Sequence, residues 1–473
     1  MSELQANTIP HEEIERNFRE IAPPLTDAEA LFEANRCVYC YDAPCTRACP
    51  THIDVPAFIK KIASGNLVGS ARVIFDANPI GATCARVCPV DVLCEGACVE
   101  NLHMNKPIEI GRLQRYATDF AFGTGRDVLK AGEPNGKSIG VVGSGPAGLS
   151  CATYLARLGY DVTIYERKDL PGGLDTYGMA EYKMTQRVST EEAQMVERLG
   201  VKFRLGVEVG RDVSVEELES AHDGVFLAVG LGETGRLGIP GEDLEGVYDA
   251  LYVIERIKSR RWETVPVGRS VAVVGAGNTA IDAVTQARRL GAERVMLVYR
   301  RSQTEMPAFE YEYTLAKQDA VEFLWQTAPV EIVADKGGTR VAGLRCVRTE
   351  LGEPDASGRR SIKPIEGSDF VVPADTIIKA TGQQKMRDFF AAIPGIELDS
   401  AGRVHVDPET MRTINPKFFA GGDCVNGGRE AVDASQMGKL AAQGIHLALT
   451  GERVEFAGAR VPVHEETQDV KTH

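Results

Sequence analysis

The chain lacks the features that would place it in a membrane, outside the cell or on nucleic acid. No apolar run approaches the roughly 20 residues of a membrane-spanning helix. Residues 1–21 are charged and have no apolar core of the kind found in a secretory signal. Lys and Arg number 53 against 67 Asp and Glu, which gives a net charge of −14. Because nucleic acids and anionic membranes bind a basic face, we expect neither as a partner, and we expect a cytoplasmic protein.

Cysteine, in contrast, is concentrated in one region. Eight of the eleven cysteines lie between Cys37 and Cys98. The first set is Cys37-x2-Cys40-x4-Cys45-x3-Cys49-Pro50, and the second is Cys84-x3-Cys88-Pro89-x4-Cys94-x3-Cys98. Thiols this dense serve in disulfides, zinc sites or iron–sulfur clusters. Without export we do not expect structural disulfides, and zinc favours pairs of Cys-x2-Cys, a spacing found here only at Cys37 and Cys40.

The two Cys-Pro steps indicate iron. In two-cluster ferredoxins three closely spaced cysteines hold one cubane, and a fourth, before a proline, binds the other cluster. By that rule a first [4Fe-4S] cluster takes Cys37, Cys40, Cys45 and Cys98. A second [4Fe-4S] cluster takes Cys49, Cys88 and Cys94. Counting thiols makes Cys84 its fourth ligand, with zinc or inert thiols as the alternative.

Three runs in this region are RCVYCYDAPCTRACPTHIDVPAFI, ATCARVCPVDVLCEGAC and IEIGRLQRYA. Together they resemble the N-terminal iron–sulfur region of dihydropyrimidine dehydrogenase, including its bacterial electron-input subunit. The spacing from Cys88 through Cys98 to Gln114 matches that family. The resemblance implies that an oxygen of Gln114 completes the second cluster and leaves Cys84 free. It also implies that the backbone at Val87 lies against a flavin. Without the resemblance, Gln114 would be interpreted as a surface helix residue.

A dinucleotide fingerprint follows a linker at residues 123–137. The sequence predicts a strand over 138–142, a helix that ends at Leu158, a strand over 162–165 and an acid, Glu166. The loop between the first strand and the helix is Gly143-Ser144-Gly145-Pro146-Ala147-Gly148. Its glycines let the backbone approach a pyrophosphate, the helix N-terminus faces that charge, and the acid binds ribose hydroxyls. We assign this first site to FAD.

A second fingerprint begins with a predicted strand over residues 270–274. Its loop is Gly275-Ala276-Gly277-Asn278-Thr279-Ala280, and the strand over 294–299 ends in Arg300 and Arg301. Where the first copy has Glu166, the second has Arg300. A carboxylate there would repel a 2′-phosphate and a pair of guanidinium groups would bind it. The second site therefore favours NADP(H) over NAD(H), although an arginine can also stack on adenine.

Other candidate cofactor residues lie outside the two fingerprints. A glycine-rich loop over 171–187 places Gly173 and Leu174 near the flavin, and Val209 is a further candidate. The resemblance adds Lys183 as a flavin contact. Residues 418–423 are a strand that enters a loop at Gly422 and Asp423, a pattern typical of flavoproteins in which the Asp binds the ribityl chain; the alternative is an Asx turn. The nicotinamide domain closes at Ala380-Thr381-Gly382.

These motifs predict an α/β protein in which a helical iron–sulfur domain is followed by two nested Rossmann-like dinucleotide-binding domains. The iron–sulfur domain covers residues 1–125. The FAD domain covers 126–245 and 383–473, and the NAD(P)H domain, residues 246–382, is inserted into it. Residues 321–381 alternate like a β-meander. In the flavin domain, Ser189 and Glu192 predict a capping box for a helix over 189–199.

The expected function is electron transfer from NAD(P)H through FAD and the two clusters to an acceptor outside this chain. The resemblance implies an FMN-containing catalytic partner subunit that reduces uracil or thymine, so we expect a hetero-oligomer. The alternatives are the small subunit of glutamate synthase, whose family lacks the CPTHIDVP run, and a non-catalytic scaffold with zinc and bound nucleotide. A disulfide reductase is excluded because Cys151, Cys346 and Cys424 stand alone.

Overall fold

The computed structural model describes residues 9–103, 105–354 and 360–458, and the chain divides into two compact units. The larger unit contains Ala22–Gly173, Arg187–Gly230 and the chain from Arg387 onward. The smaller unit contains the chain up to Ile21, Leu174–Gln186 and Leu231–Met386. In the described part of the chain, no helix has the length and apolar character needed to span a bilayer.

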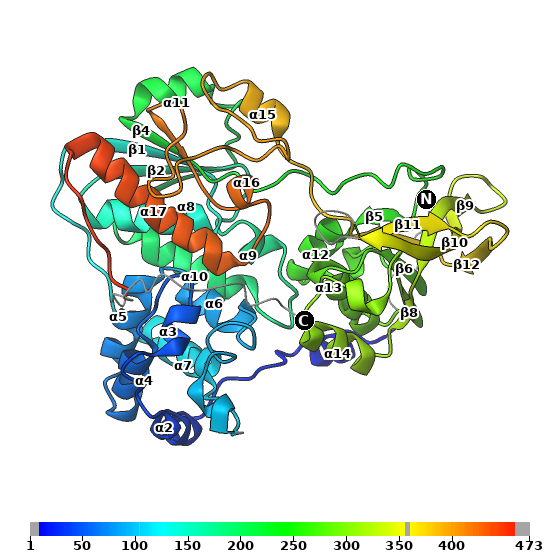
Figure 1. Ribbon diagram of the computed structural model, residues 1–473, viewed down its shortest axis with the longest axis horizontal. Helices are drawn as coiled ribbons and strands as arrows, with labels where there is room; N and C mark the ends of the chain where they lie inside the picture. Colours follow the sequence, from blue (N-terminus) through cyan, green and yellow to red (C-terminus); the bar gives the residue numbers. More distant parts are fainter. Residues whose placement is uncertain (1–8, 104, 355–359, 459–473) are drawn as a thin grey trace. The chain divides into compact units, whose positions relative to one another are not determined.

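The first part of the larger unit is helical and carries the eight clustered cysteines (Figure 1). Its elements are α2 (Asp27–Arg36), α3 (Pro44–Ala48), α4 (Val55–Ala63), α5 (Leu67–Ala77), α6 (Gly81–Val87), the 3-10 turn η1 (Val99–His103) and α7 (Ile110–Thr124). Thr26 caps α2 in a capping box with Glu29. The apolar faces of these helices form a core that includes Phe58, Ile74 and Leu113, all fully buried.

The second part of the larger unit is a parallel sheet in the order β14-β4-β1-β2-β3. Its strands are β1 (Ser138–Val142), β2 (Asp161–Glu166), β3 (Lys202–Leu205), β4 (Gly224–Leu227) and β14 (Phe418–Ala420). Its helices are α8 (Pro146–Arg157), α10 (Gln186–Glu197), α11 (Val215–Ala221), α15 (Arg387–Ala391), α16 (Asp423–Asn426) and α17 (Ala431–Thr450). β14 pairs with β4 although much of the smaller unit lies between them in the sequence, as nesting predicts.

Buried and partly buried polar contacts join the two parts of the larger unit. The Tyr154 hydroxyl donates to the carbonyl of Asp76 at 3.0 Å, and the Asp76 carboxylate pairs with Arg157 at 2.9 Å. Ser435 on α17 donates to the Asn78 side chain at 2.8 Å. Because these contacts run from α8 and α17 to α5 and the turn after it, the helical part is fixed against the nucleotide-binding sheet (Figure 1).

The predicted capping box on α10 is wrong. The helix begins at Gln186, three residues before Ser189, so Ser189 lies inside it. The Glu192 carboxylate instead accepts the backbone N–H groups of Ala82 and Thr83 at 2.8 and 2.9 Å, at the start of α6. Glu192 therefore caps a helix of the cysteine region, from a helix of the flavin fingerprint region.

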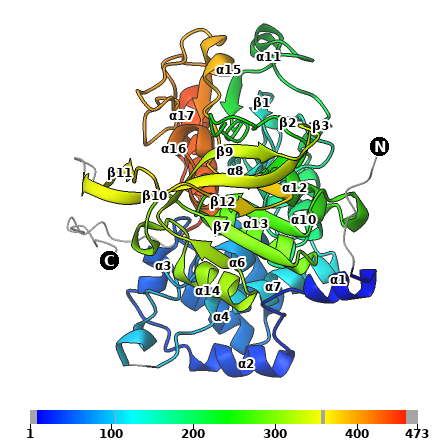
Figure 2. The same ribbon diagram turned by 90° about the vertical axis from the view of Figure 1, so that its right-hand side faces the viewer.

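The smaller unit contains a second parallel sheet in the order β5-β13-β6-β7-β8. Its strands are β5 (Val247–Asp249), β6 (Ser270–Val274), β7 (Arg294–Val298), β8 (Glu322–Leu324) and β13 (Thr376–Lys379). Its longer helices are α12 (Ala250–Lys258), α13 (Asn278–Arg289) and α14 (Glu310–Gln318). An antiparallel sheet lies in the predicted meander region (Figure 2), and its strands are β9 (Thr327–Ala334), β10 (Val341–Pro354), β11 (Arg360–Pro364) and β12 (Phe370–Pro373). The strands β8 and β13, also from this region, belong to the parallel sheet.

Two short segments pack in the smaller unit, although the sequence predicts them in the iron–sulfur and FAD domains. Residues 9–21 form α1 (His11–Asn17) and stack Phe18 on Trp262, with ring centroids 4.9 Å apart. In residues 174–186, after α9 (Leu174–Tyr177), the Tyr182 hydroxyl bonds to Thr285 at 2.7 Å. The compact units thus divide the chain differently from the three predicted domains, whose boundaries stay a prediction.

Candidate functional site

The structure brings together the four cysteines predicted for the first cluster. Cys37, Cys40, Cys45 and Cys98 all line one pocket, whose apolar wall includes Ile59. Burial raises the pKa of Cys45 to about 12, and the charges of Cys37 and Cys98 add to the increase. These thiols therefore oppose one another's ionisation and need added positive charge to become thiolates together. Bound iron supplies it, since a coordinating thiol is deprotonated outright, so the residues fit an iron–sulfur cluster.

The cysteines predicted for the second cluster also lie near one another. A hydrogen bond with Cys84 raises the pKa of Cys88 well above its ordinary value, and burial and the charges of Cys84, Cys49 and Cys94 add to it. Burial likewise raises the pKa of Cys94, with Cys49 and Cys45 among the charges that act on it. The two thiol sets are therefore neighbours. Among the described residues, no group of three or more His, Cys, Asp or Glu is placed to hold a single metal ion.

The structure places both candidates for the last ligand beside α6. Gln114 is only 7% exposed, so its interpretation as a surface residue is wrong. Its Nε2 donates to the Gly81 carbonyl at 2.7 Å, at the first residue of α6, which turns the amide oxygen away from that carbonyl. Cys84, one turn further along α6, accepts a hydrogen bond from Asn78 at 3.1 Å. The choice between Gln114 and Cys84 stays a prediction.

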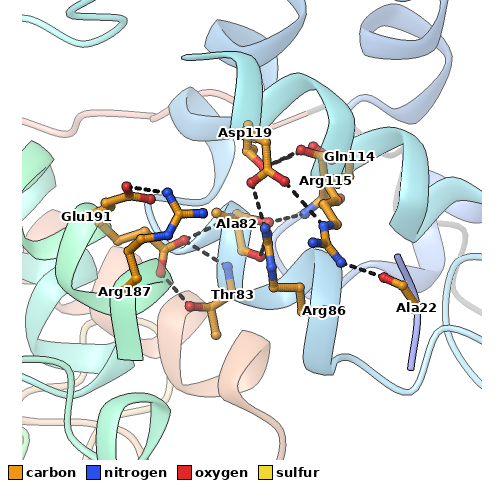
Figure 3. Close-up of polar contacts among 12 residues, drawn as sticks. Ala22, Ala82, Thr83, Arg86, Gln114, Arg115, Asp119, Arg187 and Glu191 are labelled. Carbon is orange, nitrogen blue, oxygen red and sulfur yellow. Dashed lines mark hydrogen bonds and ion pairs between the residues drawn. The ribbon is translucent and has the colours of Figure 1, made fainter. Parts of the chain in front are cut away.

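Charged residues hold α6 on more than one side (Figure 3). The Arg86 side chain is 2% exposed, pairs with Asp119 on α7 at 2.6 Å and donates to the Ala82 carbonyl at 3.0 Å. Asp119 also accepts from Arg115 at 3.2 Å. Burial raises the pKa of Glu192 to about 7 against the hydrogen bonds of Thr83 and Ala82, which lower it. Helix α6, which contains Val87 and ends at Cys88, is thus anchored to α7 and to α10.

The predicted FAD loop leaves no room for side chains at its glycines. Gly143 has φ +98°, and a Cβ there would lie 2.4 Å from the Ala228 carbonyl oxygen. A Cβ on Gly173 would lie 2.8 Å from the Cα of Gly145, so the second glycine-rich loop meets the first. Such close backbone approach at the N-terminus of α8 is the arrangement that a dinucleotide pyrophosphate requires.

Polar residues complete the predicted FAD site in the larger unit. Glu166 accepts from the backbone N–H of Ser144 at 2.9 Å and from its hydroxyl at 2.6 Å, which ties the end of β2 to the loop after β1. Gly422 has φ +77° and lies against Ala147, with Asp423 next to it at the start of α16. Val209 is buried nearby in sequence, after β3. The carboxylates stand at the carboxyl ends of β2 and β14, where ligands of parallel sheets bind.

Two residues predicted near the flavin belong to the smaller unit. Leu174 begins α9. Lys183 is buried between Asp282 on α13, at 2.6 Å, and Glu312 on α14. Burial lowers the pKa of Lys183, but the two carboxylates raise it more, so the amine stays charged. The structure shows Lys183 engaged in these ion pairs, and its contact with a flavin stays a prediction.

The second fingerprint has the same close packing in the smaller unit. A Cβ on Gly275, at φ +137°, would lie 2.3 Å from the Ala380 carbonyl oxygen, whereas the space around Gly277 is open. The Asn278 side chain accepts the backbone N–H of Phe309 at 3.2 Å, and Ala280 is fully buried, while Thr279 is exposed. Beside them, the Thr381 hydroxyl donates to the Gly235 carbonyl at 3.1 Å, and Gly382 follows with φ +91°.

The two arginines after β7 have different surroundings. Arg301 is 8% exposed, and its guanidinium donates to the Arg360 carbonyl at 3.3 and 3.2 Å. Arg300 is exposed. The sequence could not separate them, because the contact to Arg360 spans 59 residues. Arg300 is therefore the more exposed member of the pair, and its contact with a 2′-phosphate stays a prediction.

The remaining cysteines lie apart from these sites. Cys151 is on α8, Cys346 on β10 and Cys424 on α16, and each is buried. The Cys424 thiol donates to the Gly421 carbonyl at 3.3 Å. Burial raises the pKa of Cys346 and of Cys424 to about 12, which suits inert thiols.

Two family models match this chain. Residues 14–126 match "Dihydroprymidine dehydrogenase domain II, 4Fe-4S cluster". Residues 137–438 match "Pyridine nucleotide-disulphide oxidoreductase". The matches confirm the predicted helical iron–sulfur region, the dinucleotide-binding α/β fold, and FAD, NADP(H) and 4Fe-4S as cofactors.

Curated relatives cover most of the chain. The small chain of NADPH glutamate synthase from Escherichia coli is 38% identical over 442 residues, which are 90% of this chain and 93% of that one. The beta subunit of NADP⁺-dependent formate dehydrogenase from Moorella thermoacetica is 36% identical over 427 residues, 85% of this chain and 59% of that one. Both are subunits of larger enzymes by name.

Among solved structures, FprA from Mycobacterium tuberculosis in complex with NADPH has a TM-score of 0.55 and 22% identity, covering 67% of this chain and 86% of that one. At that identity the likeness shows the fold alone. The family matches and the relatives show more: this chain belongs to the pyridine nucleotide-disulphide oxidoreductase family, and it is an NADPH-dependent FAD and iron–sulfur oxidoreductase subunit similar to the small chain of glutamate synthase.

Proposed function

We propose that this chain is the electron-input subunit of a larger enzyme, which oxidises NADPH at FAD and delivers electrons through two [4Fe-4S] clusters to a partner subunit. The observation that carries the proposal is that two converging sets of thiols lie in the same compact unit as the FAD fingerprint. FAD accepts an electron pair from NADPH and releases electrons singly, which is how a [4Fe-4S] cluster accepts them.

In this proposal, each cofactor is bound by a separate set of residues. The loop from Gly143 to Gly148 binds the FAD pyrophosphate and Glu166 its ribose, with Asp423 from the late part of the chain on the ribityl side. The loop from Gly275 to Ala280 binds the nucleotide pyrophosphate, and Arg300 binds the 2′-phosphate. Helix α6 supports Val87 at the flavin and Cys88 at the second cluster, so it joins the two sites. Glu192 and Arg86 hold α6 in position.

In this proposal, electrons leave the chain from the first cluster. Cys37, Cys40 and Cys45 are only partly buried, and their pocket includes Val38, which is 59% exposed. A partner that binds over the first set can therefore come close to it.

For the partner we propose first an FMN-containing subunit that reduces a pyrimidine, in a hetero-oligomer. The family model that matches residues 14–126 carries dihydropyrimidine dehydrogenase in its description. The CPTHIDVP run and the spacing from Cys88 to Gln114 also resemble that family. The second candidate is the large chain of glutamate synthase, favoured by 38% identity to its small chain over nearly the full length.

Native purification with assay of the co-eluting subunit tests the proposed partner. We expect NADPH oxidation by the complex to depend on uracil or thymine and to stop when the co-eluting subunit is removed. Oxidation that depends on glutamine and 2-oxoglutarate instead would transfer the chain to the second candidate. A chain that purifies with full cofactors but reduces neither partner's substrate would contradict both.

A pair of substitutions tests the last ligand of the second cluster. Gln114→Ala should alter the EPR signal of one cluster and leave the other unchanged, because Gln114 contributes to the second cluster only. Cys84→Ser, the matched control on α6, should leave the iron content of both intact. The opposite result, loss of iron in Cys84→Ser with an unchanged Gln114→Ala, would make Cys84 the ligand.

Arg300→Ala tests the 2′-phosphate site. Loss of a hydrogen bond to a charged group costs about 1.5–3 kcal/mol, so kcat/KM for NADPH should fall about tenfold or more. The value for NADH should change much less. Arg294→Gln, at the exposed opposite end of β7, is the control and should affect neither. Equal losses for NADPH and NADH in Arg300→Ala would remove the 2′-phosphate assignment.

A further inference from the structure

A buried lysine on α17 points from the nucleotide-binding part of the larger unit into the cysteine region. Lys439 is 5% exposed. Its ammonium donates to the carbonyl oxygens of Thr51 at 3.0 Å and Ala457 at 3.3 Å, and it lies 5.6 Å from the centre of the Tyr154 ring. Nothing in the FAD or NADPH sites described above uses this side chain.

The charge of Lys439 has no counter-ion among the described residues. None of their carboxylates lies within 4.0 Å of its amine, and the nearby Arg157 is itself cationic and paired with Asp76. Backbone carbonyls and an aromatic face reduce the cost of burying an ammonium but do not neutralise it. Buried charges in proteins are otherwise paired, since an isolated ion in a poorly polarisable interior is strongly unfavourable.

The nearest group that becomes anionic is a predicted cluster ligand. Thr51 follows Cys49 by two residues, and its hydroxyl lies 3.3 Å from the Cys49 sulfur. Burial lowers the pKa of Lys439 to about 8, and the negative charge of Cys49 acts against that decrease and favours the protonated amine. His52 stands at the same place: its backbone N–H donates to the Cys49 carbonyl at 2.8 Å, and its buried Nδ1 has no hydrogen-bond partner among the described residues.

We propose that the second [4Fe-4S] cluster is the counter-ion of Lys439, and that this buried ammonium raises the reduction potential of that cluster. The inference rests on the proposed function, because it takes Cys49 as a ligand of the second cluster. One-electron reduction adds a negative charge to a cluster without making or breaking a bond. A cation held nearby in a medium of low polarity stabilises the reduced form more than the oxidised form.

Among the described residues, the cation that acts on a thiol of the first cluster is Arg36 near Cys98, and its charge is already paired with Glu33 at 2.6 Å. The pocket of the first cluster is lined by apolar residues, the four cysteines and one carboxylate, Glu100. Lys439 therefore distinguishes the two clusters, and it favours electron acceptance at the cluster that we place next to the flavin. The structure assigns it a role in tuning the potential rather than in binding a substrate.

The test is an anaerobic, EPR-monitored redox titration of the cofactor-loaded protein with dithionite. In Lys439→Met we expect the equilibrium constant for reduction of the second cluster to fall about tenfold, which is about 59 mV for a one-electron couple. Lys439→Arg keeps the charge and should stay near the wild-type value. Lys202→Met, which removes an exposed lysine paired with Asp161 in the same unit, should change neither cluster. The signal that Cys94→Ser alters identifies the second cluster.

An unchanged potential in Lys439→Met, with full iron, would overturn the proposal. A shift confined to the first cluster, identified through Cys40→Ser, would overturn it as well. If Lys439→Met holds less iron, Lys439→Gln, which is neutral but still donates to the Thr51 carbonyl, decides by the same measurement. Because dithionite supplies the electrons, these outcomes do not depend on NADPH oxidation. Failure of the proposed function would appear separately, as clusters that dithionite reduces and NADPH does not.

Discussion

The larger unit depends on holding thiols together that repel one another once they ionise. Cys45 and Cys88 illustrate the constraint: burial and neighbouring sulfurs raise the pKa of both. Packing alone would not require two sets of thiols from separate parts of the sequence to lie close together. Bound iron turns the repulsion into coordination, and the helices α2 to α7 then form a frame whose core is completed by the sulfur ligands.

Helix α6 connects that frame to the nucleotide-binding sheet. It is short, and much of what fixes it comes from elsewhere: Glu192 binds its first N–H groups, and Asp119 holds Arg86 near its end. Lys439 approaches the same region from α17. The cysteine region and the flavin fingerprint therefore behave as one structural body, which suits electron transfer between cofactors because their separation is set by packed helices rather than by a linker.

Much of the fold could be predicted from local patterns. Both fingerprints have strands, loops and helices where the glycines and the alternation of apolar residues put them, since those signals act within one element. The errors came from contacts between distant segments. Ser189 and Glu192 have the spacing of a capping box, but Glu192 bonds to residues 109 and 110 positions away. Phe18 packs on Trp262, and no pattern in residues 9–21 predicts that contact.

The site was predictable to a similar degree. Cysteine spacing indicated which thiols meet, because the Cys-Pro steps carry that information. Spacing could not show that Gln114 is buried against Gly81, that Arg301 donates to the Arg360 carbonyl, or that Lys439 donates to the Thr51 carbonyl. Each of these depends on tertiary packing, and Lys439 has no motif around it. The sequence signal for a buried Lys439 is its position as a charged residue within the largely apolar helix α17.

The most direct test of the account is a count of iron, acid-labile sulfide and flavin in protein prepared without oxygen. Two cubanes beside one FAD predict about eight iron atoms and about eight sulfides per flavin. A preparation that contains flavin but neither iron nor sulfide would contradict the claim that these cysteines hold electron-carrying clusters.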